Sequence, residues 1–339
     1  MMGLIDRYID YVENVRRYSP RTVAIYSEVL ADYANMIAAD SGKDGTDGLQ
    51  SVSDEELVSS LNPSELRSYQ VHLLDSKRLS PKTVNLHISV MSGFCQWLLK
   101  AGLLNSNPVK LIPRPKISKR LPVFYKKDSI QHYFDSTAVW TSQEMLDAFV
   151  QCPDTNNGKE LYTHRLDRLI VSMLFGLGIR RAELISMNIG DVDFSRKVAK
   201  VHGKGDKMRE IPLIVSLCEE ILLYLKAVER MMGGQRSLNE PLLVTYTGKR
   251  LYPVYVDKAV KSQLEGAEGV TGRKSPHVLR HSLATELLDE GADLNSIKEL
   301  LGHASLAATQ VYTHNTIAKL KTIYQSAHPR AKNGGKHGD

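Results

Sequence analysis

Residues 275–281 read Ser-Pro-His-Val-Leu-Arg-His, and this stretch predicts where a helix of the second half of the chain begins. A serine followed by a proline is typical of a helix N-cap and of the first helical residue. Apolar residues then follow at helical spacing, at Leu279, Leu283, Leu287 and Leu288. His277 and Arg280 are therefore expected on adjoining turns. Because a helix N-terminus favours anions, a phosphate would be well placed beside these two side chains.

Four more polar residues of the second half stand in distinctive local phrases. Arg180 lies in Gly-Ile-Arg-Arg-Ala-Glu-Leu, Lys204 in Gly-Lys-Gly, His303 in Leu-Leu-Gly-His and Tyr312 in Tyr-Thr-His. Together with His277 and Arg280, they predict a site that cleaves a phosphodiester bond. Two guanidinium groups can pair with the non-bridging oxygens and compensate the charge that develops on them.

Tyr312 is the predicted nucleophile of this site. A phenol has a pKa near 10, so it needs a proton acceptor, and His277 is the natural one. The departing 5′ oxygen must gain a proton, which Lys204 could donate from a hairpin tip. The product would be a phosphotyrosine that another strand can attack, so the chemistry requires no ATP and no cofactor.

A metal site is the alternative reading of one part of this set. His277 and His281 are four residues apart on the expected helix, which is also a spacing of metal ligands. Val278 stands where a zinc protease has its glutamate, however, and no carboxylate or cysteine cluster joins the pair. We therefore expect no metal.

These phrases resemble the tyrosine recombinase (lambda-integrase-like) family, and particularly its Xer branch. Residues 275–281, the Gly-Ala-Asp-Leu of 291–294 and the Ala-His-Pro-Arg-Ala of 327–331 share the resemblance, which covers nearly the whole chain. It implies that Arg180 and Arg280 bind the scissile phosphate and that Lys204 is the general acid. It also implies that His277 serves Tyr312 as acid and base, and that His303 hydrogen-bonds a phosphate oxygen.

Glu183 matches the acidic position that the family has three residues after its first arginine. The resemblance implies that this carboxylate orients the catalytic groups without touching the substrate. The alternative is an ordinary surface residue of a helix.

The expected fold is mainly α with a small antiparallel β-sheet. Residues 197–201 and 208–211 alternate like strands around a Gly-Lys-Gly-Asp turn, so Lys204 is expected at a hairpin tip. Lys207 and Arg209, beside this hairpin, are expected to contact DNA phosphates. The apolar run from Leu169 to Ile179 is too short for a membrane span and predicts a core helix.

The N-terminal third is expected to be a helical bundle. The phrase Ser-Pro-basic-Thr-Val occurs at residues 19–23 and again at 80–84, and each copy predicts a capped helix start. Arg21 and Lys82 are the basic residues, and the resemblance implies a core-binding, SAM-like domain that holds DNA phosphates with such helix starts. Ordinary capping within a bundle is the equal alternative.

Length and composition predict more than one domain. A chain of 339 residues is longer than one compact core usually holds, and a hydrophobic fraction of 42% is enough for two domains. We expect a core-binding domain over 1–112, a basic, proline-containing linker over 113–127, a catalytic domain over 128–328 and a flexible tail over 329–339. Loops at about 40–62 and 126–161 look longer than in compact Xer members, and the second is expected to include a helix over 143–150.

The function implied is that of a DNA recombinase acting through a 3′-phosphotyrosyl intermediate, with Xer-like resolution of chromosome dimers as the leading role. The net charge of +6 suits its expected partner, double-stranded DNA. The resemblance also implies a tetramer on paired sites, either of one chain or with a second related recombinase, and regulation by a septal DNA translocase.

Two other functions stay open. One is the same chemistry in an integrase or invertase of a mobile element or phase-variable locus, and the other is an inactive DNA-binding protein that organises a synapse. Three cysteines without paired spacing and the lack of a signal peptide indicate a cytoplasmic protein without membrane insertion.

Overall fold

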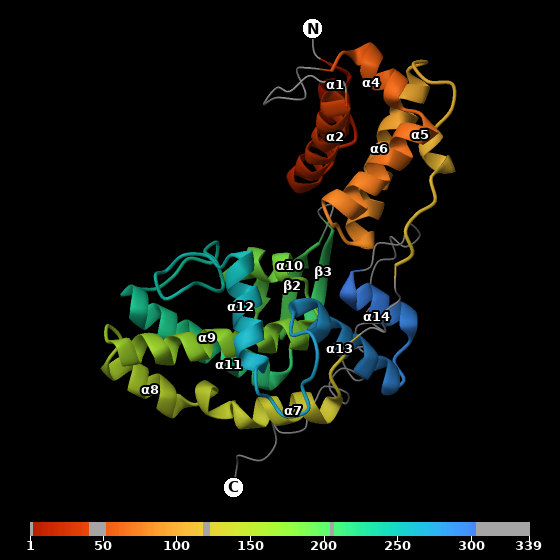
Figure 1. Ribbon diagram of the computed structural model, residues 1–339. Helices are drawn as coiled ribbons and strands as arrows, with labels where there is room; N and C mark the ends of the chain where they lie inside the picture. The colour runs from red at the N-terminus through yellow and green to blue at the C-terminus, as the bar shows by residue number, and fades with distance from the viewer. Residues whose placement is uncertain (1–2, 41–51, 118–122, 204–206, 303–339) are drawn as a thin grey trace. The chain divides into compact units, whose positions relative to one another are not determined.

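The chain separates into two compact units, Met1–Arg120 and Leu121–Asp339, in a computed structural model that describes residues 3–40, 52–117, 123–203 and 207–302. Each unit is built around its own cluster of buried hydrophobic side chains (Figure 1). The described residues form helices and one small antiparallel sheet, so the expected fold class is confirmed.

The N-terminal unit is entirely helical in its described part. Its α-helices are α1 (Leu4–Asp10), α2 (Pro20–Asp40), α4 (Asp54–Ser60), α5 (Pro63–Val71) and α6 (Pro81–Lys100). Two π-helical turns, Tyr11–Val15 and His72–Ser76, and a 3₁₀ turn, Pro108–Leu111, complete it. Aromatic rings fill its centre, where Tyr8 packs on Phe94 and Tyr33 meets Tyr69 edge to face.

The repeated Ser-Pro-basic-Thr phrase builds the same helix start twice. The Oγ atoms of Ser19 and Ser80 accept hydrogen bonds from the N–H groups of Thr22 and Thr83, at 3.3 and 3.2 Å. Each copy follows a π-helical turn and a basic residue with positive φ, Arg17 in the first copy and Arg78 in the second. The two predicted capped starts, at Pro20 and Pro81, are therefore confirmed.

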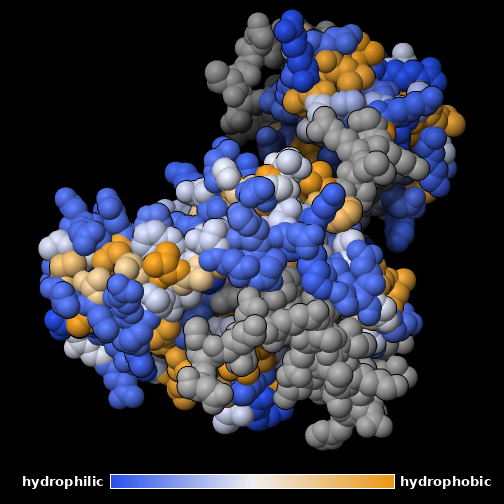
Figure 2. Space-filling view, turned by 90° about the horizontal axis from the view of Figure 1, so that it is seen from below, coloured by the Kyte–Doolittle hydropathy of each residue, from blue (hydrophilic) through white to orange (hydrophobic). Residues whose placement is uncertain are grey.

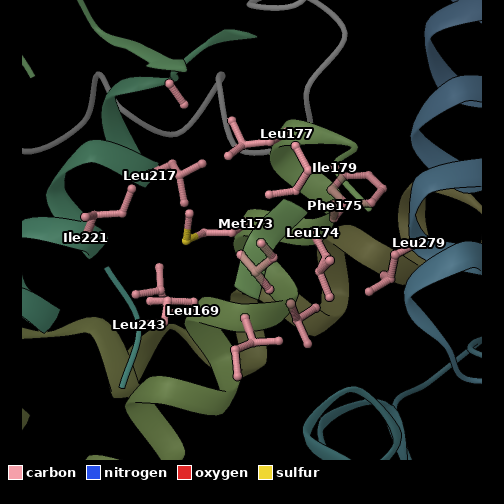
Figure 3. Close-up of a cluster of buried hydrophobic side chains, with 14 of the residues drawn as sticks. Leu169, Met173, Leu174, Phe175, Leu177, Ile179, Leu217, Ile221, Leu243 and Leu279 are labelled. Carbon is pink, nitrogen blue, oxygen red and sulfur yellow. The ribbon is translucent and has the colours of Figure 1, made fainter. Parts of the chain in front are cut away.

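The C-terminal unit has α9 as its central helix. Its α-helices are α7 (Lys127–Ser136), α8 (Gln143–Gln151), α9 (Asn156–Leu177), α10 (Arg181–Ser186), α11 (Val215–Met232), α12 (Pro253–Leu264), α13 (Pro276–Asp289) and α14 (Leu294–Leu301), with 3₁₀ turns at Ala138–Thr141 and Ile189–Asp191. Side chains of α9 point toward Leu217 and Ile221 of α11 on one side and Leu279 of α13 on another (Figure 3). The apolar run from Leu169, which predicted a core helix, forms the last part of α9.

The sheet consists of β1 (Val192–Asp193), β2 (Val198–His202) and β3 (Met208–Pro212) in the order β1-β2-β3. Both pairings are antiparallel, and β2 meets β3 with Val201 opposite Arg209. The N–H of Gly203 donates to the carbonyl of Lys207 at 2.8 Å, which continues the pairing toward the tip. The two predicted strands are thus confirmed, whereas residues 204–206 lie outside the described part of the chain.

The segment from 126 to 161 is helical, and its prediction as a long loop was wrong. It forms α7, a 3₁₀ turn and α8, and α8 is the helix expected over 143–150. Two buried arginines of α9 anchor it, because Arg165 donates to the carbonyl of Ser142 and Arg168 to the hydroxyl of Thr137. In the segment from 40 to 62, the described part is mostly α4, which a Ser53–Glu56 capping box starts.

The expected linker is irregular over 113–117 and 123–126, as its prolines require, and its last residue, Lys127, begins α7. The carbonyls of Pro113 and Pro115 accept hydrogen bonds from Gln70 and Asn85 of the N-terminal unit. On the other side of residues 118–122, the N–H of Tyr125 donates to Ser282 of α13. Each described end is therefore part of the unit beside it.

The surface is mixed in polarity. On the face drawn in Figure 2, hydrophilic residues cover most of what is visible and hydrophobic residues form separate small patches. Such scattered apolar residues are normal for a protein surface. None of the helices in the described ranges is long and apolar enough to cross a membrane.

Candidate active site

Arg180 is positioned by the end of α9. Gly178 ends that helix in a left-handed conformation with φ 58°, and Arg180 then stands at the N-cap of α10. A Cβ at Gly178 would lie 2.7 Å from Leu301 and 2.8 Å from Leu283, so only glycine fits against α13 and α14 here. The turn leaves the Arg180 side chain 37% exposed, which is accessible to a ligand.

Glu183 is a buried residue of α10, so its alternative reading as a surface residue was wrong. One carboxylate oxygen accepts from Arg180 Nη1 at 2.7 Å and from Arg209 Nη1 at 3.2 Å. The other accepts from the Arg180 backbone N–H and from Arg209 Nη2, both at 2.8 Å. Burial raises the pKa of Glu183, but these hydrogen bonds lower it further than burial raises it, so the net shift is downward and the carboxylate is ionised.

Arg209 is not an exposed DNA contact, which corrects its predicted role. Its side chain is 7% exposed, because β3 directs it toward the interior of the unit. The guanidinium holds Glu183 with two hydrogen bonds and donates through Nε to the carbonyl of Leu300 at 2.9 Å. Because these N–H groups already bind protein atoms, Arg209 is a partner of Glu183 and Leu300 and not of the DNA phosphate that was expected.

Arg280 lies on α13 and is buried. Its guanidinium donates to the carbonyl of Gly178 at 2.5 Å and to the carbonyl of Leu301. Arg180 donates in turn to the carbonyl of Gly302 at 2.8 Å. With the bond from Arg209, three arginines therefore hold the three consecutive carbonyls of residues 300–302 at the C-terminus of α14, the end that carries partial negative charge.

The charges of this cluster favour an anion. Arg180, Arg209 and Arg280 bring three positive charges together, and Glu183 is the carboxylate that they share. Burial, with repulsion from the other two arginines, lowers the pKa of Arg280 to about 10, so its guanidinium still carries its charge at neutral pH. Such an excess of positive charge away from bulk water favours an anionic ligand over a neutral one.

His277 stands at the second residue of α13, and its side chain is exposed. The predicted helix start at Pro276 is confirmed, and so is the placement of His277 one turn before Arg280. Ser275 is the N-cap residue, as predicted, but among the described residues its Oγ has no hydrogen-bond partner, and it is its backbone carbonyl that accepts from Val278 and Leu279. Of the predicted leucine stripe, Leu288 is exposed.

Three residues of the predicted set, Lys204, His303 and Tyr312, lie outside the described residues. Their neighbours in sequence are described, since Gly203 follows β2 and Gly302 caps α14. The structure therefore brings Arg180, Glu183 and Arg280 together beside the two chain positions that precede Lys204 and His303.

The other predicted DNA contacts are exposed residues. Arg21 and Lys82 lie on the first turns of α2 and α6, and Lys207 precedes β3.

Arg209 was not predicted to be the partner of Glu183, although the sequence contains a signal for this buried ion pair. In a strand, alternate residues face the same side, so Arg209 shares a face with Ile211, which is fully buried. A basic residue in phase with the apolar positions of a strand indicates a buried ion pair more than a solvated contact.

Comparison with known proteins agrees with this fold. Residues 140–319 match the Phage integrase family, and residues 4–103 match the Phage integrase, N-terminal SAM-like domain. The chain is 32% identical to the tyrosine recombinase XerC of Chlorobaculum parvum over 96% of this chain and 94% of that one. It is 31% identical to XerC of Listeria monocytogenes over 97% and 98% of the two chains.

Solved structures support the fold. The XerH recombinase bound to palindromic difH substrate, a post-cleavage complex, superimposes with a TM-score of 0.60 at 19% identity, covering 94% of this chain and 82% of that one. A lambda integrase dimer bound to a COC′ core site gives 0.57 at 15% identity, covering 92% and 98%.

An N-terminal SAM-like bundle, followed by a helical unit with a small antiparallel sheet, is the architecture of a site-specific DNA recombinase that uses a tyrosine. The chain belongs to the phage integrase family. Within that family it is a tyrosine recombinase of the Xer type.

Proposed function

We propose that Tyr312 is the nucleophile of this recombinase and that Arg180 and Arg280 bind the scissile phosphate. The phenol oxygen of Tyr312 attacks phosphorus, and the bond from phosphorus to the 5′ oxygen breaks. His277 takes the phenol proton, and Lys204 gives a proton to the departing 5′ oxygen. The phosphate stays on the 3′ end of the strand as a phosphotyrosine, which a 5′ hydroxyl can attack in the reverse step.

The remaining groups stabilise and orient. His303 donates a hydrogen bond to a non-bridging phosphate oxygen. Glu183 fixes the guanidinium of Arg180: the carboxylate and the carbonyl of Gly302 each accept one hydrogen bond from it, and its other N–H groups are left for the substrate. Exposed Arg21, Lys82 and Lys207 contact backbone phosphates of double-stranded DNA, which positions the duplex without reading its sequence.

The observation that carries this proposal is a cluster of three guanidinium groups, two of which hydrogen-bond the carboxylate of Glu183. Arg180, Arg209 and Arg280 come from three different elements, and their shared counter-charge is Glu183. A phosphate between Arg180 and Arg280 would offset the remaining positive charge as well as gain bidentate hydrogen bonds.

The biological role that we propose is resolution of chromosome dimers in the cytoplasm, by a tetramer on two paired DNA sites. The tetramer contains this chain alone or with a second related recombinase, and a septal DNA translocase is its proposed regulator. The identities of about 30% to curated XerC chains over nearly the full length support this role. The same chemistry in a mobile element or an invertible locus is the alternative.

The test is to trap covalent protein–DNA adducts in the native host and to sequence the attached ends, with Tyr312→Phe as control. We expect adducts at one site of the chromosome terminus in the wild type and none in the variant. Adducts at the borders of mobile elements or inverted promoters would support the alternative. A wild type that occupies DNA without forming adducts would contradict the assigned chemistry.

A further inference from the structure

We propose that Arg209 is a positioning residue of the recombination reaction, which holds the phosphate-binding arginine and two neighbouring chain segments in one arrangement. This role rests on the function proposed for Arg180. Arg209 itself contacts no substrate in this proposal, because its guanidinium is buried and directed at protein groups.

The first contact is with the carboxylate that orients Arg180. Arg209 Nη2 and Nη1 reach the two oxygens of Glu183 at 2.8 and 3.2 Å, and the same carboxylate binds the side chain and the backbone N–H of Arg180. Without Arg209, Glu183 would be a buried carboxylate with one cationic partner, and it would be free to rotate toward Arg180 or to draw in water. Arg209 therefore fixes the angle at which Arg180 presents its guanidinium.

The second contact is with the C-terminus of α14. Arg209 Nε donates to the carbonyl of Leu300 at 2.9 Å, and a Cβ at Gly302 would lie 3.0 Å from Arg209 Nη1. Gly302, with φ 64°, is thus packed directly on the guanidinium. The next residue in the sequence is His303, so the plane of Arg209 fixes the point from which that segment departs.

The third contact is with the base of the β2–β3 hairpin. A Cβ at Gly203 would lie 3.5 Å from Arg209 Nη1 and 3.8 Å from Glu183 Oε1, which puts the Gly203 backbone beside the ion pair. Gly203 is followed in the sequence by Lys204. One guanidinium thus touches the segments that lead to three of the proposed catalytic groups, which are far apart in the sequence.

The fork of an arginine is needed for this arrangement. Lysine would keep the charge, but its single ammonium cannot hold two carboxylate oxygens and a carbonyl in fixed directions. A displacement of about 1 Å at a catalytic group can slow a reaction about 100-fold. Arg209→Lys is therefore expected to impair the chemical step while the fold and the DNA affinity survive.

The test compares Arg209→Lys with Arg168→Lys, in the full-length protein. Arg168 is also a buried arginine paired with a glutamate, Glu220, in the same unit, so its variant carries the same general cost to stability. We would measure the equilibrium binding of a target duplex and the single-turnover rate of adduct formation on a nicked substrate. We expect about a 100-fold slower rate for Arg209→Lys at unchanged DNA affinity, and a normal rate for Arg168→Lys at a temperature where both are folded.

A substrate with sulfur in place of the bridging 5′ oxygen separates a defect that acts through Glu183 and Arg180 from one that acts through proton donation by Lys204. A thiolate leaves without needing a proton, so only the second defect is rescued by this substrate. Arg209→Lys is expected to stay slow on it, since its defect lies in how Arg180 meets the phosphate during the chemical step, while the affinity for DNA is unchanged. Full recovery on this substrate would overturn the route through Glu183 and Arg180. Wild-type rates for Arg209→Lys, or equal losses in both lysine variants, would also overturn the proposal.

The failure of the underlying function is distinguishable from these outcomes. If the wild type forms no adduct that Tyr312→Phe lacks, the assigned chemistry fails, and the role of Arg209 fails with it. If the wild type forms that adduct, only the behaviour of Arg209→Lys decides the role.

Discussion

Two buried glutamates of the C-terminal unit have pKa values that are shifted in opposite directions. Glu183 accepts hydrogen bonds from Arg209 and Arg180, and its pKa falls. Glu286 of α13 is also buried, but among the described residues its Oε1 has no hydrogen-bond partner and the nearest cation, Lys127, is 3.7 Å away. Burial raises the pKa of Glu286 to about 7, with Glu290 and Asp289 adding to the shift and Lys127 opposing it.

The raised pKa of Glu286 predicts a stability that depends on pH. Between its ordinary value of 4.5 and about 7, the unfolded chain loses this proton while the folded chain keeps it, so unfolding becomes easier as the pH rises. Glu286→Gln has no such proton to lose. We expect the variant to gain about 3 kcal/mol in free energy of unfolding relative to wild type between pH 4.5 and pH 8.

Urea unfolding of both proteins across that pH range measures this difference. A difference between the two proteins that stays constant from pH 4.5 to pH 8 would contradict the raised pKa. Glu265→Gln is a suitable control, because that carboxylate is largely exposed.

Helix ends, more than helix bodies, build the site. The C-terminus of α9, the N-terminus of α13 and the C-terminus of α14 meet where Arg280 bonds the carbonyls of Gly178 and Leu301. Carbonyls at a helix end have no partner within the helix, so arginines supply one, and the site and the packing of three helices become a single arrangement.

Gly178 is the position where this packing is tightest. Gly178→Ala would put an alanine at φ 58° and drive its Cβ to 2.7 Å from Leu301, so we expect a loss of about 3 kcal/mol in the free energy of unfolding. Adduct formation should also slow, because the carbonyl of Gly178 holds Arg280.

Gly233→Ala is the matched control for this change. Gly233 caps α11 with φ 74°, but no atom of the described residues lies within 4 Å of an added Cβ. Only the backbone cost of about 1 kcal/mol is expected there, with normal cleavage. Equal losses in the two variants, measured by denaturant unfolding, would show that close packing at Gly178 contributes nothing.

In the protein as a whole, the two units contribute different groups of basic residues. The N-terminal unit presents two equivalent capped helix starts with Arg21 and Lys82 on their first turns, and the C-terminal unit holds the arginine cluster. The net charge of +6 favours a polyanion for the chain as a whole, but the placement of charge decides which contacts position DNA.

Arg21→Ala and Lys82→Ala test the contribution of the N-terminal unit. We expect each to weaken binding to any DNA sequence and to lower by about 1 the slope of log affinity against log salt concentration, because one phosphate contact is lost. Lys100→Ala is the control, since Lys100 is exposed at the opposite end of the helix that carries Lys82. A slope as in wild type for both variants would assign the two helix starts to capping alone.

Local patterns in the sequence determined the elements of this protein and the identity of its chemical groups. The helix starts at Pro20, Pro81 and Pro276 and the strands of the β2–β3 hairpin follow from capping residues and periodicity, which act over a few neighbouring positions. The same locality explains why the phrases around Arg180 and Arg280 were enough to indicate phosphodiester chemistry.

Only the tertiary structure decided which polar side chains are buried and what they hold. The partners of Arg180 and Arg280 on α14 and α9 are 122 and 102 residues away in the sequence, and Arg209 packs against the C-terminus of α14, where it donates to the carbonyl of Leu300. A sequence pattern gives the face of a strand on which Arg209 lies, but the element that covers that face comes from elsewhere in the chain. Because a local pattern does not include the covering element, the sequence predicted Arg209 as a DNA contact, whereas in the folded protein it is an internal ion-pair partner.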